Sequence, residues 1–250
     1  MALTPWDKLL TSLQNKEIVL PHLEAAILSE KWPDEFTVRV DSRPYYGKGD
    51  GYFHPSSHPL MGARQLYYLF HPDHQSQLIP ERRDTTSHMI LEVGSALHAI
   101  TQTKMLMTGL VASEKDIEVE FVNTEHHVRG RTDMICTLPG QGRVMVEIKT
   151  INPWALKKLD GGLKPSWEAQ MSLAMDALGF DTGVLLAVES GFPFHMHEIP
   201  VRRNDELLVQ IYEKFDYVRA AIAANEPPRP CCAFGSDEMK ACPARSVCWS

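Results

Sequence analysis

The sequence predicts a mixed α/β protein with a central mixed β-sheet flanked by helices. Two observations carry this prediction. Apolar residues recur at helical spacing up to about residue 110, and between residues 116 and 151 the period changes from 3.6 to 2. Helical and strand-like segments then alternate as far as residue 225. The resulting order of helix, three strands, helix, two strands and helix is typical of a mixed α/β core.

The N-terminal part of the chain predicts short helices and one long loop. Residues 5–31 have helix-like spacing, and Pro21 fits the first turn of the second of two helices. Residues 33–59 are rich in Gly, Pro, Ser, Tyr and His, a composition typical of a loop. Residues 61–70 then predict a short helix. We interpret residues 1–54 as a helical and loop segment that precedes the main domain.

A long helix is predicted over residues 85–110. Thr86 or Ser87 is suited to its N-cap, and Gly109 to its end. An apolar stripe runs along this helix and consists of Ile90, Val93, Leu97 and Ile100. A stripe of this kind predicts one buried helix face.

Three strands are predicted next, over residues 116–122, 126–138 and 143–151. Only short segments separate them, and the second of these contains Pro139-Gly140-Gln141-Gly142. Tight connections join antiparallel neighbours, so we expect a three-stranded antiparallel meander.

The second half of the chain returns to helices and strands. A helix is expected over residues 164–180, with Ser166 as its N-cap and Gly179 at its C-terminal end. A last amphipathic helix over residues 204–225 begins at Asn204. Two further strands lie between these helices, over residues 183–190 and 195–201.

Composition places the chain among ordinary globular proteins. Of its 250 residues 44% are apolar and 23% charged, which excludes disorder, collagen and coiled coil. No apolar run approaches the ~18–20 residues that span a bilayer, and the N-terminus lacks the pattern of a signal peptide. We therefore expect a cytoplasmic protein with no membrane partner. A formal charge of −7 argues against coating nucleic acid by bulk charge, but allows a local basic groove around central carboxylates.

Asp133 and the run Glu147-Ile148-Lys149 form the most informative pattern. Residues two apart on a strand share a face, so Glu147 and Lys149 point the same way. A hairpin across residues 139–142 brings Asp133 near Glu147. Two carboxylates, a Lys and a backbone carbonyl then converge, as metal-assisted phosphodiester hydrolysis requires. A Glu and a Lys two residues apart are also common as a surface ion pair, and this alternative stays open here.

Further motifs accompany this pattern in order along the chain. They are Gly94-Ser95-Ala96-Leu97-His98, Gly130-Arg131-Thr132-Asp133 and, on the following helix, Gln170. Together with the Glu-x-Lys run they resemble the motifs of the PD-(D/E)XK nuclease superfamily. The resemblance is to its RecB-like exonuclease branch, which includes the CRISPR-associated iron–sulfur exonucleases and phage relatives. It implies a PD-(D/E)XK nuclease-like core over residues 55–226.

The resemblance implies a role for each matched residue. Asp133 and Glu147 would be catalytic residues and metal ligands, with the backbone carbonyl of Ile148 as a third oxygen. Lys149 would be the catalytic Lys, and His98 would add a nitrogen ligand, so the implied cofactor is Mg2+ or Mn2+. His98 has an alternative interpretation as a polar residue buried in the helix interface.

Residues around this centre are expected to bind DNA. In iron–sulfur members of the branch a Cys-Pro-Arg triplet supplies one cluster ligand, and the matching triplet here is Gly62-Ala63-Arg64. The family's Tyr after the motif Gln falls at Ala174, so Gln170 either contacts DNA or orients the site. Glu120 is either an outer carboxylate of the site or a solvated residue. The expected DNA-binding residues are Arg64, Gln170, Tyr68, Lys157 and Lys158, with core packing as the alternative for Tyr67 or Tyr68.

Four of the five Cys residues fall in the last twenty positions. In a reducing compartment such a group favours a metal site over disulfides. By the family comparison the tail, residues 227–250, would pack on the core. The comparison implies a [4Fe-4S] cluster held by Cys231, Cys232, Cys242 and Cys248, with His54 or His58 as an alternative fourth ligand. Thiolates with or without one imidazole suit tetrahedral Zn2+ equally well. A tail with free thiols is the third alternative. Cys136, on a predicted strand, is expected in the core.

The first functional hypothesis is a divalent-metal-dependent DNA exonuclease, an enzyme that hydrolyses phosphodiester bonds at DNA ends. The resemblance implies a role in recombination, repair or phage replication. Single-stranded ends are the expected substrate, and a recombination or replication protein is the expected partner. A structure-specific endonuclease stays an alternative, because the same core serves both activities. The alternative from another class is a nuclease-fold subunit that binds DNA or a partner and whose catalysis is dispensable or lost.

Overall fold

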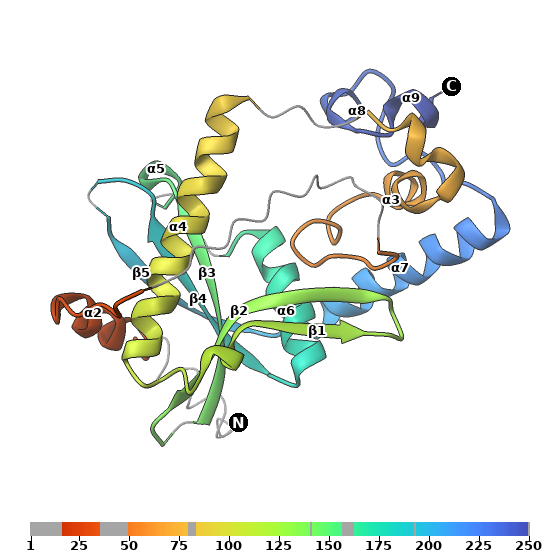
Figure 1. Cartoon of the computed structure of the whole chain (residues 1–250). Helices are drawn as coiled ribbons and strands as arrows, with labels where there is room; N and C mark the ends of the chain where they lie inside the picture. The colour runs from red at the N-terminus through yellow and green to blue at the C-terminus, as the bar shows by residue number, and fades with distance from the viewer. Residues whose placement is uncertain are drawn as a thin grey trace, which may run out of the picture.

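A mixed five-stranded β-sheet forms the centre of the protein (Figure 1). The computed structural model describes residues 17–35, 50–79, 84–140, 142–156, 163–192 and 194–249. The strands stand in the order β1-β2-β3-β4-β5. They are β1 (Ile117–Asn123), β2 (Val128–Leu138), β3 (Gly142–Ile151), β4 (Thr182–Glu189) and β5 (Met196–Arg202). The predicted mixed α/β class is confirmed.

Strand pairing follows the prediction for the first three strands. β1, β2 and β3 form an antiparallel meander. β4 then pairs with β3 in parallel and with β5 antiparallel. A parallel pair needs a crossover connection, and the one between β3 and β4 contains α6 (Pro165–Leu178). β3 and β4 lie inside the sheet and are covered on both faces, which explains their nearly continuous apolar sequences.

Helices cover both faces of the sheet. On one face lie α6 and α7 (Asp205–Ala224), and on the other α2 (Leu20–Leu28) and α4 (Thr85–Met107) (Figure 1). Alternate residues of β3 enter the two cores, because successive side chains of a strand point to opposite faces. Met145 packs on the side of α6 and α7, whereas Val146 and Ile148 pack on the side of α2 and α4. Two layers of buried apolar side chains therefore hold the sheet between its helices.

The start of α2 is stabilised by a residue far away in the sequence. Glu198 on β5 accepts hydrogen bonds from the backbone N–H groups of Ile18, Val19 and Leu20, at 2.9, 2.9 and 2.8 Å. The first N–H groups of a helix have no partner inside the helix, and a carboxylate there also interacts favourably with the helix dipole. Within the described part of the predicted 5–31 segment, α2 is the helix, and Pro21 lies in its first turn.

The predicted ends and buried face of α4 need correction. The helix begins at Thr85, and its N-cap is Asp84, whose side chain accepts from the Ser87 N–H at 2.8 Å. Of the predicted stripe, Ile90 and Val93 are 66% and 38% exposed. The buried residues lie in the C-terminal half of the helix and are Ala99, Thr101, Gln102, Lys104 and Met105. The apolar pattern is real, but the N-terminal turns of α4 extend past the sheet (Figure 1).

Of the other predicted helix ends, the N-cap of α6 needs correction, whereas the C-terminal end of α6 and the N-cap of α7 agree with the prediction. α6 starts one residue before the predicted cap: Lys164 is its N-cap, and Pro165 fixes the first helical residue in place of Ser166. Its C-terminal end agrees with the prediction, because Gly179 has the left-handed φ of 75°. The predicted cap of α7 is confirmed, with the Asn204 side chain accepting from the Leu207 N–H at 3.0 Å.

The C-terminal tail packs against α3 (Ala63–Phe70). Two short helices of the tail, α8 (Asp237–Ala241) and α9 (Arg245–Cys248), follow α7. Tyr67 and Tyr68 of α3 are buried in one cluster with Ala244, Val247 and Cys248. The remaining short elements are η1 (Pro72–Gln77), η2 (Glu114–Asp116) and α5 (Pro153–Leu156). Within the described residues, no helix combines the length and the apolar character that a bilayer crossing demands.

Candidate active site

Asp133 and Glu147 lie opposite each other on β2 and β3. The ladder pairs Met134 with Val146, so the next residues along the two strands are the two carboxylates. Asp133 Oδ2 accepts a hydrogen bond from the backbone N–H of Ile148 at 2.6 Å, which holds the carboxylate across the hairpin. The structure therefore brings together the residues of the Asp and Glu-x-Lys motifs.

Lys149 and Gln170 complete a buried hydrogen-bonded group around Glu147. Lys149 Nζ lies 2.8 Å from Glu147 Oε1 and donates to Gln170 Oε1 at 2.8 Å. Gln170, on α6, donates through Nε2 to the same oxygen of Glu147 at 2.5 Å. Because Glu147 and Gln170 are 3% and 9% exposed, these contacts are shielded from water and fix the positions of both charged groups.

The surroundings shift the acid–base properties of this group. Burial, and then the charge of Asp133, raises the pKa of Glu147 to about 7. Burial alone would lower the pKa of Lys149, but the carboxylates of Glu147 and Asp133 outweigh it and raise that pKa. For His98, burial acts to lower the pKa, and the hydrogen bond and charge of Asp133 raise it above its ordinary value. Lys149 therefore keeps its charge at neutral pH, while Glu147 titrates near neutrality.

His98 reaches the carboxylates from α4. Its Nδ1 lies 3.5 Å from Asp133 Oδ1. One turn earlier, Gly94 faces β3, where an added Cβ would lie 3.1 Å from Thr150 Oγ1. The glycine of this motif thus permits the close approach of helix and strand that places the imidazole at the site.

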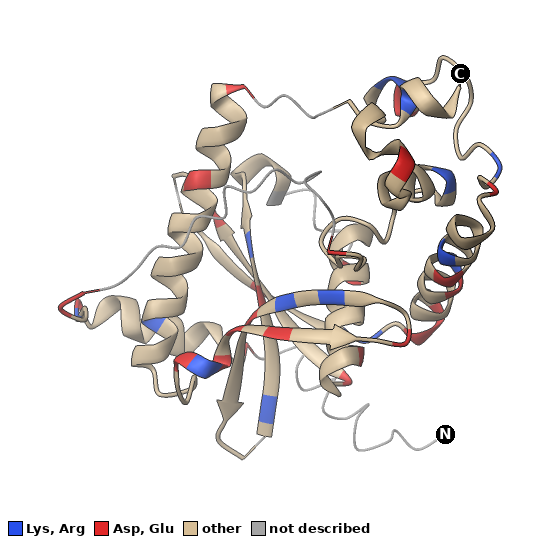
Figure 2. Ribbon diagram, turned by 45° about the vertical axis from the view of Figure 1, so that its right-hand side comes forward, with Lys and Arg blue, Asp and Glu red and all other residues tan. Residues whose placement is uncertain are grey.

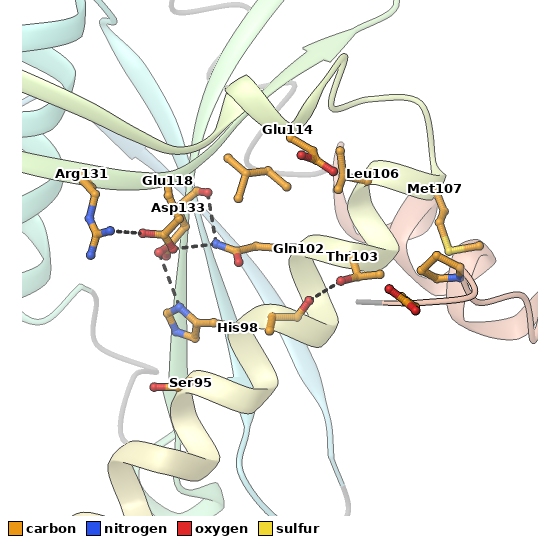
Figure 3. A pocket seen from close by; sticks show the side chains of 14 residues that line it. Ser95, His98, Gln102, Thr103, Leu106, Met107, Glu114, Glu118, Arg131 and Asp133 are labelled. Carbon is orange, nitrogen blue, oxygen red and sulfur yellow. Dashed lines mark hydrogen bonds and ion pairs between the residues drawn. The ribbon is translucent and has the colours of Figure 1, made fainter. Parts of the chain in front are cut away.

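A cavity of about 970 Å³ opens beside Asp133 (Figure 3). The polar side chains that line it include Ser95, His98, Gln102, Glu118, Arg131 and Asp133. Gln102, Glu118 and Arg131 are functional candidates to which the sequence motifs assign no role. Two of them carry a simple signal: Gln102 lies four residues after His98 on one helix face, and Arg131 lies two residues before Asp133 on one strand face.

Glu118, rather than Glu120, is the carboxylate of β1 that lines the cavity. Glu120 is exposed and lies opposite Arg131 in the ladder. Of the two alternatives for Glu120, the structure therefore agrees with a solvated residue. Glu118 stands between the pairs Ile117–Met134 and Val119–Thr132, which sets it beside Asp133.

The donor atoms at this site fit a hard divalent cation in chemistry. Among the described residues, no three His, Cys, Asp or Glu side chains stand in the geometry of a metal site. In this arrangement His98, the Ile148 N–H and Lys149 contact oxygens of the two carboxylates. Carboxylate oxygens with one imidazole are nevertheless the ligands that Mg2+ and Mn2+ accept. Glu147, whose pKa is raised by burial and by Asp133, is also a group whose charged form a cation would stabilise.

Arg64 and Tyr68 are engaged inside the molecule. The Arg64 guanidinium donates to Cys248 Sγ at 3.1 Å, to the Pro228 carbonyl at 2.7 Å and to the Cys248 carbonyl at 3.1 Å. Tyr68 is buried, and Arg64 lies 5.5 Å from the centre of its ring. In the structure both side chains hold the tail against α3. The other predicted DNA-binding pair, Lys157 and Lys158, lies outside the described residues.

The four tail cysteines are free thiols, and two of them contact the start of α3: Cys231 at Gly62 and Cys248 at Arg64. A Cβ added at Gly62 would lie 2.3 Å from Cys231 Cβ and 2.6 Å from its Sγ, so Cys231 fills the space beside Gly62. Burial, together with the neighbouring thiols of Cys231, Cys248 and Cys232, raises the pKa of Cys242. Within the part of the chain that the structure describes, none of these cysteines belongs to a group of metal-site geometry. The remaining thiol, Cys136, is buried in the core as predicted.

His54 and His58 lie together in the loop before α3. The His54 backbone N–H donates to His58 Nδ1 at 2.7 Å, so this nitrogen must be unprotonated. Burial, and then the neighbouring His54, lowers the pKa of His58 to about 3. His58 is therefore held as a neutral, buried acceptor that shapes the loop.

This burial predicts a stability that falls in mild acid. The folded pKa of His58 lies below its unfolded value of about 6.5, so the unfolded chain binds more protons between about pH 6.5 and 3. The contribution of neutral His58 to the free energy of unfolding is complete above pH 6.5. It decreases as the pH is lowered, by about 2 kcal/mol at pH 5. The variant His58→Asn keeps an acceptor for the His54 N–H without the titration. Thermal unfolding from pH 7 to 5 should therefore be less pH-dependent in His58→Asn, and equal slopes would contradict the assignment.

The comparisons with known proteins give structural neighbours. No protein-family model and no curated protein matches this sequence. An alkaline exonuclease from Laribacter hongkongensis has a TM-score of 0.52 at 19% identity, over 70% of this chain and 89% of that chain. The crystal structure of SSO0001 has a TM-score of 0.46 at 16% identity, over 93% of this chain and 96% of that chain. The likeness to the alkaline exonuclease shows that the two chains share a fold.

Proposed function

We propose that this chain is a divalent-metal-dependent DNA exonuclease that hydrolyses phosphodiester bonds at DNA ends. The observation that carries the proposal is the convergence of Asp133, Glu147 and Lys149 on adjacent strands, with His98 beside Asp133 at the wall of a cavity. A solvated ion pair would not explain a Glu147 that is 3% exposed beside a second carboxylate. The fold shared with an alkaline exonuclease supports the same class of reaction.

The residues have distinct roles in the proposed reaction. Asp133, Glu147, the Ile148 carbonyl and His98 would hold Mg2+ or Mn2+, which when bound polarises the phosphoryl oxygen and acidifies the attacking water. Lys149 keeps its proton at neutral pH and presents it to the negative charge that develops on the phosphate. Gln170 positions Lys149 and Glu147 relative to each other through its amide.

The positive charges are few and lie among acidic residues, a distribution that favours DNA binding at one small site over binding along a broad surface. In the view of Figure 2, basic residues of β2 and β3 lie close to acidic ones, and helix α7 carries both signs. With a net charge of −7, binding depends on these few cations rather than on a broad basic face. For such a site we expect salt-sensitive binding that becomes tighter with divalent metal, and we propose single-stranded ends as the substrate.

An end-labelled cleavage assay tests the activity. The protein is incubated with linear single-stranded DNA, linear duplex and closed circular single strands, in Mg2+, Mn2+ or a chelator. We expect short products from linear DNA, an intact circle and no cleavage in the chelator. Cut circles would instead establish an endonuclease, and binding without cleavage in either metal would establish a nuclease-fold binding subunit.

A pair of matched variants links this activity to the site. Asp133→Asn removes the charge of the carboxylate beside His98 and is expected to abolish cleavage. Asp216→Asn makes the same change in another Asp–His pair, in which His126 Nδ1 lies 2.8 Å from Asp216 Oδ2. This control should cleave at the wild-type rate. Cleavage that survives Asp133→Asn would refute the assignment of the site.

A further inference from the structure

Glu118 has an unusual backbone for a strand residue. Its φ is 52°, in the left-handed region that a side chain other than Gly, Asn or Asp seldom adopts. The ladder continues on both sides, with Ile117 opposite Met134 and Val119 opposite Thr132. Such conformations persist only where surrounding contacts impose them, and they gather at active sites. The left-handed backbone therefore indicates that the Glu118 side chain has a functional role, which its contacts identify.

Two polar side chains hold the Glu118 carboxylate at the cavity. Gln102 Nε2 donates to Glu118 Oε1 at 3.0 Å and to the backbone carbonyl of Asp133 at 3.3 Å. Arg131 Nη1 lies 3.4 Å from Glu118 Oε2. Figure 3 shows these side chains directed toward one another beside Asp133 and His98. The left-handed residue thus places a carboxylate between an amide of α4 and a guanidinium of β2.

Arg131 is placed to meet an anion. Among the described residues that line the cavity, it is the one Lys or Arg. Its side chain is 31% exposed, so it is partly screened yet reachable from the cavity. It shares a strand face with Asp133, two residues further along. A guanidinium carries five N–H donors in a planar fork that matches a phosphate group.

We infer that Arg131 binds a backbone phosphate of the strand in this cavity, and that Glu118 is the residue that positions its guanidinium. The inference rests on the proposed function, since it names the part of the site that receives the DNA backbone. A surface ion pair that only adds stability would not require a left-handed Glu or a place on the cavity wall.

Binding measurements on Arg131 variants test the first half of the inference. Fluorescence anisotropy with a labelled single strand is measured in Mg2+ on a chain that also carries Lys149→Met and Glu147→Gln. This pair of changes removes both buried charges together and is expected to leave the chain folded and inactive, so that the DNA stays intact. We expect Arg131→Ala to raise the Kd about tenfold and to lower the slope of log Kd against log salt by about 1. Arg131→Lys should recover part of the affinity. The matched control is Arg129→Ala, because Arg129 lies on the same strand, pairs with Asp50 at 3.7 Å and does not line the cavity.

A double variant tests the positioning role of Glu118. Glu118→Gln keeps an acceptor for Gln102 but loses the charge that holds Arg131, and should raise the Kd about threefold. Together with Arg131→Ala it should add nothing further, because both changes remove the same oriented guanidinium. Additive losses would overturn the positioning role, and an unchanged Kd in Arg131→Ala would overturn the phosphate site.

Cleavage by the chain with Lys149 intact separates this inference from the proposed function. If wild type cleaves DNA and Arg131→Ala has the same KM, the phosphate site fails while the nuclease stands. If wild type does not cleave but its affinity depends on Arg131, the nuclease fails and the phosphate site stands. We expect cleavage in wild type and a raised KM with little change in kcat for Arg131→Ala.

Discussion

Replacing Lys149 with Ala is expected to lower the rate of DNA hydrolysis by about 10²- to 10³-fold. The Lys149 ammonium lies 2.8 Å from Glu147 Oε1, and the two carboxylates raise its pKa. It is therefore a fixed positive charge, which in the proposed reaction lies beside the phosphate, and its removal should act on the transition state more than on binding. Single-turnover cleavage of labelled linear DNA in saturating Mg2+ should show a fall in kcat with little change in KM.

The same substitution leaves Glu147 buried without its partner, so stability has to be measured as well. An unpaired buried charge costs about 3–5 kcal/mol. Glu147 limits this cost by taking up a proton, because burial and Asp133 raise its pKa and the variant lacks the Lys149 charge that lowers it. Lys149→Met retains the apolar stem, and Lys149→Met with Glu147→Gln removes both charges. We expect the double variant to unfold at or above the wild-type temperature and to be inactive.

A surface pair supplies the control for this series. Lys240, 2.9 Å from Asp237, is an exposed Lys–carboxylate pair, so Lys240→Ala should leave cleavage and melting unchanged. A folded Lys149→Met chain that cleaves at the wild-type rate would show that Lys149 takes no part in the reaction.

The positions of Asp133 and Glu147 can be predicted from the sequence, because they depend on one short connection and on the alternation of side chains along two strands. The Pro139–Gly142 connection fixes the hairpin, and alternation along the strands then sets Asp133 and Glu147 on one face. The pairing of β3 with β4 and the position of α6 need long-range contacts that no local pattern contains. Their main consequence for the site is the placement of Gln170 against Lys149 and Glu147.

The position of Glu118 at the cavity cannot be predicted from the alternation of side chains along β1. Glu118 and Glu120 have the same parity on β1, so the pattern cannot tell which of them reaches the cavity. The left-handed backbone of Glu118 belongs to the folded state and leaves no mark on the sequence of apolar residues. The exposed stripe at Ile90 and Val93 has a related cause, since apolar spacing predicts a helix face but not how far the sheet beneath it extends.

Replacing Gly62 with Ala is expected to destabilise the packing of the tail on α3. Gly62 has φ −71° and ψ 151°, which any residue adopts, so its backbone does not require glycine. Glycine is required by the available space, because a Cβ there would lie 2.3 Å from Cys231 Cβ. Overpacking of this kind costs about 1–3 kcal/mol, which corresponds to a fall of about 2–12 °C in Tm for a chain of this size.

Removing the opposing side chain should reverse this effect. Cys231→Gly takes away the two side-chain atoms that crowd the new Cβ and leaves only the Cα, at 3.8 Å, so Gly62→Ala with Cys231→Gly should regain most of the lost Tm. The coupling in this double-mutant cycle should exceed about 1 kcal/mol. Gly62→Ala with Cys232→Gly is the matched control and should show no recovery. Equal melting of Gly62→Ala and wild type would contradict the close contact.

Exchanging Gly62 and Cys231 also tests whether the tail thiols bind a [4Fe-4S] cluster, bind zinc or stay free. Gly62→Cys with Cys231→Gly moves one thiol across the contact, to the position that the Cys-Pro-Arg comparison assigns to a cluster ligand. If the tail holds a [4Fe-4S] cluster, anaerobically purified wild type and the exchanged chain should both absorb near roughly 400 nm, and Cys231→Gly alone should not. A colourless wild type with stoichiometric zinc would select the zinc alternative. A metal-free wild type that still shows the Gly62–Cys231 coupling would establish the tail as a packing element, held by its apolar contacts and by Arg64.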